Sequence, residues 1–336
     1  MSAQTLPARN APKPIVGRLV FSVVILAVAA AILLYRQQII DQISFRSYQP
    51  SAAVGAVAER AQLSDEGRFY LYASQPRIQD RTAFNTSCTT AKSETTVVLG
   101  CYVAQRIYLF NVTDSRLDGI QEVTAAHEML HAAYDRLSDS ERGRVNALLE
   151  TEAGKITDPD FVALMKEYEQ SEPGERDNEL HSIIGTQVSS LAPELEQYYS
   201  RYFTDRAAVV KLYTNYQAVF ASIKAQQSQL VSDMDQLIGQ INSATDAYNS
   251  GVTKLNSDIQ QFNQRASSGG FSSESEFNSE RSVLVARQQK LASDRTLIDG
   301  YIATYNTKKQ QLSEINSQAE ALNRSINSNL TPLPSL

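Results

Sequence analysis

The chain has 336 residues, 42% of them apolar, and its 31 basic and 37 acidic side chains give a net charge of −6. That length is enough for two domains. Residues 37–205 hold most of the negative charge, because 15 Lys and Arg stand there against 26 Asp and Glu, a net charge of −11. Affinity for nucleic acid depends on basic side chains that neutralise phosphates, so this balance excludes a nucleic-acid partner.

An apolar segment near the N-terminus predicts a membrane anchor. Leu19–Leu34 carries no charge, and residues 15–35 extend it to about the 20 residues that cross a bilayer. Positive charges alone precede it, so residues 1–36 are predicted to be a cytosolic tail and a single-pass transmembrane helix, with the rest of the chain extracytoplasmic in the cell membrane. A signal peptide cleaved at Ala27–Ala29 is the alternative, but the apolar run continues past that site.

The two cysteines, Cys88 and Cys101, would then lie in a compartment that permits disulfides. They flank a Thr-rich segment, so we predict a bridge that closes a small loop. Two unpaired buried thiols are the alternative.

The first part of the extracytoplasmic region is predicted to contain strands. Residues 37–65 have a mixed pattern and are predicted to be a connector. β-Branched and aromatic residues dominate 69–73, 95–103 and 106–112, and the last two segments are predicted to be adjacent strands joined by Ala104–Gln105.

From Leu117 to Leu137 the apolar residues recur at steps of three and four, which predicts a helix. Further helices are predicted from Asp139 to about Glu152, from Pro159, from Asp177 or Asn178, and from Pro193.

After Asp205 the composition changes to Gln, Asn, Ser, Leu and Ile, with a heptad spacing of apolar residues. One such seam runs from Tyr216 to Ala266 and a second from Leu284 to Ile326, separated by Ser267–Gly270. Residues 206–336 are therefore predicted to form a long antiparallel coiled-coil hairpin, which can bind a protein partner. A looser helical bundle is the alternative.

A His-Glu-Met-Leu-His motif lies inside the predicted helix 117–137. His127 and His131 are four residues apart and share a helix face, so both imidazoles can bind one metal ion. Glu128 lies beside them, where it can act as the general base on a metal-bound water. Zn²⁺ suits imidazole and carboxylate ligands and is the predicted cofactor.

This motif, following the strand 106–112, resembles the zincin class of metallopeptidases over residues 95–200. The resemblance implies an α+β, mostly helical catalytic domain with a small β-sheet over residues 37–205. It implies hydrolysis of a peptide bond in an extracytoplasmic protein or peptide. It also implies that the strand before the motif pairs with an extended substrate, which makes Tyr108 and Phe110 predicted substrate-binding residues.

Two residues of one predicted helix compete for the third metal position. The metzincin pattern is excluded, because Tyr134 and Leu137 stand where it has Gly and His. Glu179 matches the downstream helical Glu of gluzincins and is favoured, although the Asp that thermolysin-like members place four residues later is absent. His181 is the alternative. Residues two apart on a helix point about 200° apart, so only one of the two can face the ion.

A peptidase also needs a donor to the oxyanion that forms on the attacked carbonyl. Tyr198, Tyr199 and Tyr202 follow the third-ligand helix, and Tyr134 lies one turn after the motif. Tyr199 is the predicted catalytic donor. The alternative is that these tyrosines belong to the core.

A second class of function is a non-catalytic cell-surface scaffold or spacer, in which the coiled coil binds a partner and the metal site is structural. Glu128 favours the enzyme, because a structural site has no use for a general base beside its ligands. A third alternative, a precursor in which the hairpin covers the cleft, has no specific sequence support.

Overall fold

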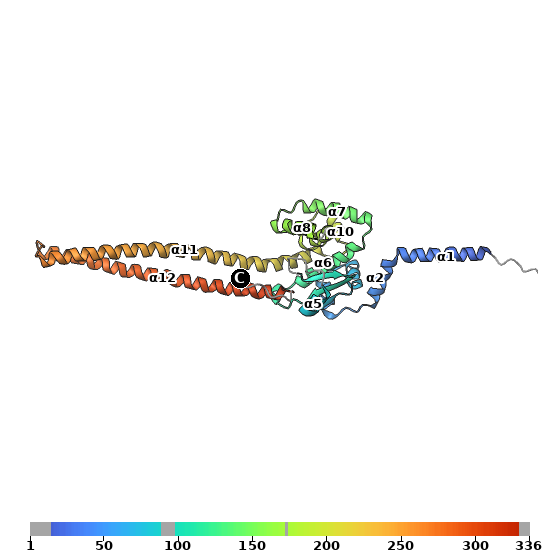
Figure 1. Cartoon of the computed structure of the whole chain (residues 1–336), viewed down its shortest axis with the longest axis horizontal. Helices are drawn as coiled ribbons and strands as arrows, with labels where there is room; N and C mark the ends of the chain where they lie inside the picture. The colour runs from blue at the N-terminus through green and yellow to red at the C-terminus, as the bar shows by residue number, and fades with distance from the viewer. Residues whose placement is uncertain (1–14, 89–97, 172–173, 329–336) are drawn as a thin grey trace, which may run out of the picture. The chain divides into compact units, whose positions relative to one another are not determined.

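The computed structural model describes residues 15–88, 98–171 and 174–328, and it divides into two compact units (Figure 1). The first unit contains the described residues up to Tyr216 together with those from Ile326 onward, and the second is Gln217–Ser325. The division falls inside a helix, after the boundary expected at Asp205, and the end of the chain returns to the first unit.

The first unit consists of short helices around a small sheet, which confirms the predicted α+β class. Its elements in chain order are α1 (Ile15–Leu34), α2 (Arg36–Ser47), α3 (Ala52–Arg60), α4 (Asp65–Ala73), β1 (Arg77–Gln79), α5 (Arg81–Ser87), β2 (Gly100–Val103), β3 (Arg106–Phe110), a 3-10 turn (Ser115–Leu117), α6 (Ile120–Asp135), α7 (Asp139–Ala153), α8 (Pro159–Ser171), α9 (Arg176–Gln187), α10 (Pro193–Tyr199) and the start of α11 (Arg206–Ser267).

In the described part of the chain the strands form one sheet in the order β1-β3-β2, with β3 parallel to β1 and antiparallel to β2. Ala104 and Gln105 join β2 to β3 with φ angles of 49° and 61°. Two consecutive positive φ angles are what a type I′ hairpin turn requires. The predicted pairing of these two strands is confirmed, whereas residues 95–97 of the predicted strand lie outside the described residues.

Two sequence predictions in the N-terminal half are wrong. Residues 69–73 are helical, because Ser64 caps α4 by accepting a hydrogen bond from the amide of Gly67, and two acidic residues occupy its first turn. The connector expected over 37–65 contains α2 and α3. Its aromatic residues pack against α4, with the rings of Phe45 and Phe69 5.2 Å apart, so tertiary contacts stabilise helices that the sequence pattern does not indicate.

Helix α6 is the central element of the first unit. It packs against β2 and β3 on one side and α9 on another, with α3 and α4 also in contact (Figure 1). Small residues such as Ala125, Ala126 and Ala132 are fully buried and allow these neighbours to approach closely. The helix begins after Gly119. Its φ of +96° is one that other residues rarely adopt, and a Cβ atom there would lie only 2.9 Å from Leu212 Cδ2.

The end of α6 is joined to α2 by a buried ion pair. Arg136 donates to both carboxylate oxygens of Asp41 at 2.8 and 2.7 Å, and also to the hydroxyl of Tyr102 on β2 at 2.9 Å. Asp41 is only 3% exposed. Because the pair is bidentate and shielded from water, it fixes α2 on α6 and the sheet.

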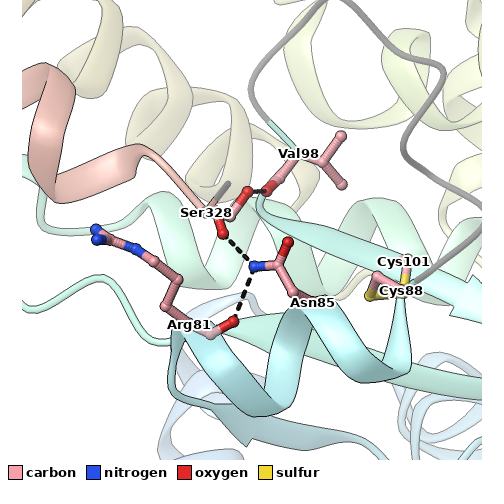
Figure 2. Close-up of a disulfide and its surroundings, with 6 residues drawn as sticks. All are labelled: Arg81, Asn85, Cys88, Val98, Cys101 and Ser328. Atoms are coloured by element: carbon pink, nitrogen blue, oxygen red, sulfur yellow. Dashed lines mark hydrogen bonds between the residues drawn. A yellow bond between two sulfur atoms is a disulfide. The ribbon is translucent and has the colours of Figure 1, made fainter. Parts of the chain in front are cut away.

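The C-terminal residues close the other edge of the first unit. Cys88 at the end of α5 and Cys101 on β2 form the predicted disulfide, and Ser328 lies beside this pair of elements (Figure 2). The hydroxyl of Ser328 donates to the carbonyl of Val98 at 2.6 Å, and the side-chain amide of Asn85 donates to the carbonyl of Ser328. Ser328 is therefore held by α5 and by the segment that leads into β2.

The second unit is an antiparallel hairpin formed by the greater part of α11 and α12 (Glu274–Ile326), which lie side by side (Figure 1). As the residue number rises along α11, the number of the hydrogen-bonded residue on α12 falls, so the two helices are antiparallel, as predicted. The cross-helix pairs are Gln227 with Asn316, Asp233 with Lys308, Asp258 with Arg287 and Arg265 with Glu280.

Among the described residues, no single helix has both the length and the hydropathy of a membrane span. Val20–Leu34 and Arg36–Ser47 meet the criterion only as a pair, and their axes differ in direction by 67°. The transmembrane helix therefore stays a prediction.

We predict that Asp41→Ala lowers the free energy of unfolding of the first unit by about 3–5 kcal/mol, because Arg136 is left buried without its counter-charge. The change is measured on the full chain in detergent by denaturant titration of tyrosine fluorescence. Asp294→Ala, which removes the partner of the exposed residue Lys290 on α12, is the control and should change little. Equal small effects of both variants would contradict the structural role of the buried pair.

Candidate metal centre

Two residues of α6 and one of α9 bring three metal-binding side chains together. The donor atoms of His127, His131 and Glu179 all lie within 4.8 Å of one another. The two Nε2 atoms are 3.0 Å apart, and oxygens of Glu179 lie 3.5 Å from His127 Nε2 and 3.4 Å from His131 Nε2. This group can hold a metal ion, with Glu179 as the third ligand.

The helix geometry explains how the three side chains meet. The four-residue spacing on α6 sends both imidazoles to one face, and α9 packs on that helix with Glu179 in its first turn. Burial by itself raises the pKa of Glu179, but its electrostatic interactions with the imidazoles of His131 and His127 and a hydrogen bond from Tyr168 outweigh it and lower the pKa to about 2. The carboxylate is therefore ionised and ready to bind a cation.

Asn178, next to Glu179, determines which nitrogen of His131 faces the group. Its side-chain nitrogen donates to a carboxylate oxygen of Glu175 at 3.1 Å, so its Oδ1 is the atom that lies 2.9 Å from His131 Nδ1. An amide oxygen only accepts, so Nδ1 carries the proton and Nε2 keeps its lone pair for a metal ion. In the sequence, the one indication of this role is that Asn178 stands next to Glu179.

Tyr168 on α8 is a second residue that the sequence did not assign to the site. Its hydroxyl donates to the carboxylate of Glu179, and its side chain is 8% exposed. The sequence pattern places Tyr168 on an apolar helix face together with Phe161 and Met165. Tyrosines in a protein core show the same pattern, so it does not indicate a role at the site.

Glu128 lies outside this donor group and packs against β2. A Cβ atom on Gly100 would lie 2.6 Å from Glu128 Oε1 and 2.6 Å from Thr124 Cγ2. Only glycine therefore lets the first residue of β2 approach the Glu128 carboxylate so closely. Glu128 is 6% exposed, in keeping with this close contact.

His181 is not a ligand, and the alternative three-histidine site is wrong. The side chain is fully buried on the opposite side of α9 from Glu179, as the helical period requires for residues two apart. Its Nε2 lies 2.9 Å from the hydroxyl of Tyr198. Burial is the largest cause that lowers the pKa of His181 to about 3, and the nearby imidazoles of His131 and His127 act in the same direction, so His181 is neutral at pH 7.

Tyr199 is not available as an oxyanion donor, so that prediction is also wrong. It is fully buried, and its hydroxyl donates to the backbone carbonyl of His181 at 2.7 Å. Tyr198 and Tyr202 share the same cluster, with their hydroxyls 3.3 Å apart, and Tyr134 donates to Asn146 at 3.0 Å. These tyrosines pack the core behind the site, which was the alternative interpretation.

The predicted substrate strand is also misassigned. Both edges of β3 are occupied, by β1 and by β2, so no peptide can add to it. Phe110 is 5% exposed in an apolar cluster with Phe84 and Cys101, and Tyr108 packs against this cluster. Neither residue can therefore pair with a substrate strand as predicted.

No protein family, curated protein or solved structure matches the chain.

We predict that Glu179→Ala removes the bound metal and that His181→Phe keeps it, because only Glu179 reaches the two imidazoles. The measurement is elemental analysis of the purified full chain after loading with metal and removal of the excess. His181→Phe fills the buried volume and serves as the matched control on the same helix. Metal lost from the His181 variant and retained by the Glu179 variant would reverse the assignment.

Proposed function

We propose that the first unit is a zinc-dependent metallopeptidase of the zincin class that hydrolyses peptide bonds in an extracytoplasmic protein or peptide. The observation that carries the proposal is the triangle of donor atoms, with edges of 3.0, 3.4 and 3.5 Å. Ligands about 2.1 Å from a tetrahedral Zn²⁺ lie about 3.4 Å apart, which fits this triangle. Three protein ligands leave the fourth position for water or substrate, as catalytic sites do.

The residues in and around the triangle have separate chemical roles. When bound, Zn²⁺ lowers the pKa of a coordinated water to about 7 and polarises the carbonyl of the scissile bond. His127, His131 and Glu179 hold the ion. Glu128, adjacent to His127 but outside the ligand set, accepts the proton of the attacking water and delivers it to the leaving amine.

Tyr168 is the donor that we propose for the oxyanion, in place of Tyr199. Its hydroxyl already reaches Glu179, within the metal-binding group. A hydroxyl at that place can turn from the carboxylate to a negatively charged oxygen that develops beside the metal.

The substrate strand that we propose is β2. It lies at an edge of the described sheet, and its first residue, Gly100, contacts Glu128. An extended peptide that pairs with this edge would lie next to the general base, whereas β3 has no free edge.

We also propose that α1 anchors the enzyme in the cell membrane with the catalytic unit outside the cytosol. The side chains from Val20 to Leu34 include large apolar residues that are 51–78% exposed, and positive charges alone precede them. An apolar helix without a protein neighbour is stable in lipid rather than in water.

The hairpin supports a further role in binding a protein partner. Large apolar side chains on it are 39–55% exposed, namely Val231 and Ile238 on α11 and Val283, Val285, Leu297 and Ile302 on α12. A hairpin that only separates two domains has no need of them.

We predict that Glu128→Gln lowers peptide hydrolysis by about 10²–10⁴-fold while the metal content is unchanged, because the amide cannot accept the proton. Cleavage of a mixed peptide library by the full chain in lipid vesicles is followed by mass spectrometry. Glu59→Gln on the exposed surface of α3 is the control and should retain full activity. Unchanged hydrolysis by the Glu128 variant would exclude the proposed mechanism.

We predict that Gly100→Ala lowers hydrolysis by about 10²-fold, because its methyl group displaces the Glu128 carboxylate by about 1 Å, and that it leaves the three metal ligands in place. Gly143→Ala is the matched control, since nothing lies within 4 Å of its Cβ position. Activity and metal content are measured on the same preparations. Loss of metal from the Gly100 variant would show that β2 supports the ligands rather than the general base.

A further inference from the structure

Helix α2 has one face packed on the rest of the first unit and one face that is exposed among the described residues. On the outer face, Tyr35, just before the helix, Ile39 and Ile43 follow one another at four-residue steps and are 58%, 42% and 63% exposed. Residues four apart share a helix face, so these side chains form a continuous apolar stripe. The stripe continues directly from the exposed apolar side chains of α1.

The inner face of α2 is held by specific bonds. Asp41 forms the buried pair with Arg136, and Gln37 accepts a hydrogen bond of 2.9 Å from Gln105 in the β2–β3 turn. The hydroxyl of Tyr48, just after the helix, donates to the carbonyl of Pro76 at 2.6 Å. Turning the helix to bury the stripe would break these bonds, so the stripe stays on the outside.

The composition of the outer face suits a lipid surface. Arg36 and Arg46 are exposed on α2, and its one acidic residue, Asp41, is neutralised by Arg136. Exposed apolar residues with neighbouring Arg side chains are typical of helices that lie in the headgroup region of anionic membranes. The axis of α2 differs from that of Val20–Leu34 by 67°, so a helix that follows an anchor along the bilayer normal turns toward the membrane plane.

We propose that α2 lies on the bilayer surface, with Ile39 and Ile43 inserted between the headgroups and with Arg36 and Arg46 toward anionic lipid. The proposal rests on α1 being the membrane anchor, and it goes further because it seats the catalytic unit itself on the membrane. Asp41 and Arg136 are then the connection between the membrane-bound helix and the helix that carries the metal-binding histidines.

This connection limits how far the site lies from lipid. From His127 to Arg136 the rise along α6 is about 14 Å, and a helix with its side chains, such as α2, is about 10 Å thick. The metal group then lies within about 25 Å of the bilayer surface. The substrates that fit this position are extended segments of membrane proteins just outside the bilayer, rather than free soluble proteins.

The absence of tryptophan from the chain makes a direct test possible. Ile43→Trp places a single tryptophan, excited selectively at the red edge of the tyrosine absorption, on the outer face of α2, in the full chain reconstituted in vesicles of zwitterionic and anionic phospholipids. We expect its emission to shift to shorter wavelength and to be largely quenched when the lipid acyl chains carry bromine atoms. Val162→Trp on α8, a position that is 51% exposed, carries the same side chain and should be unquenched.

Val24→Trp separates this inference from the proposed anchor. Quenching at position 24 together with unquenched emission at position 43 would overturn the placement of α2 and leave the anchor intact. Absence of quenching at position 24 would overturn both. Emission at position 43 that shifts to shorter wavelength without quenching by brominated lipid would indicate that protein covers the stripe, which also overturns the proposal. None of the three positions belongs to the metal group, so metal content and hydrolysis test the peptidase independently.

Discussion

The burial of α6 is the constraint on which the rest of the first unit depends. The helix contacts the sheet on one side and α9 on another, so its alanines are covered, and the four-residue step places His127 and His131 on one face. The sheet brings Gly100 against Glu128, and α9 brings Glu179 to the imidazoles. The contact with the sheet adds a strand beside Glu128, and the contact with α9 adds the carboxylate of Glu179. A preorganised arrangement of this kind is what catalysis at a metal site requires.

The same packing separates charged from neutral polar groups on α9. Glu179 faces two imidazoles and a tyrosine hydroxyl and remains ionised, whereas His181, two residues later, faces a layer of tyrosines and remains neutral. A charged side chain at the position of His181 would be buried without a counter-charge. The free-energy cost of removing it from water exceeds the gain from one hydrogen bond to Tyr198. The tyrosine layer therefore supports the metal-binding side of the helix without taking part in it.

The end of α6 connects three elements through one side chain. Arg136 follows directly on the last turn of the helix and pairs with Asp41 of α2 while also contacting Tyr102 of β2. One guanidinium therefore joins α2, the helix that carries His127 and His131, and the strand that contacts Glu128. Ser328 donates a hydrogen bond to the carbonyl of Val98, in the segment before β2.

The sequence by itself determined the features that depend on local spacing. The four-residue step of His127 and His131, the heptad seams and the Cys88–Cys101 bridge each follow from residues close together in the chain. Only the tertiary structure brought Glu179 rather than His181 to the two imidazoles, placed Tyr168 beside Glu179 and Tyr199 in the core, and made β3 a central strand. Those outcomes depend on which face of α9 meets α6, on where α8 packs, and on the pairing of β1 with the edge of β3 that β2 does not occupy. These are contacts between distant segments, and no local period encodes them.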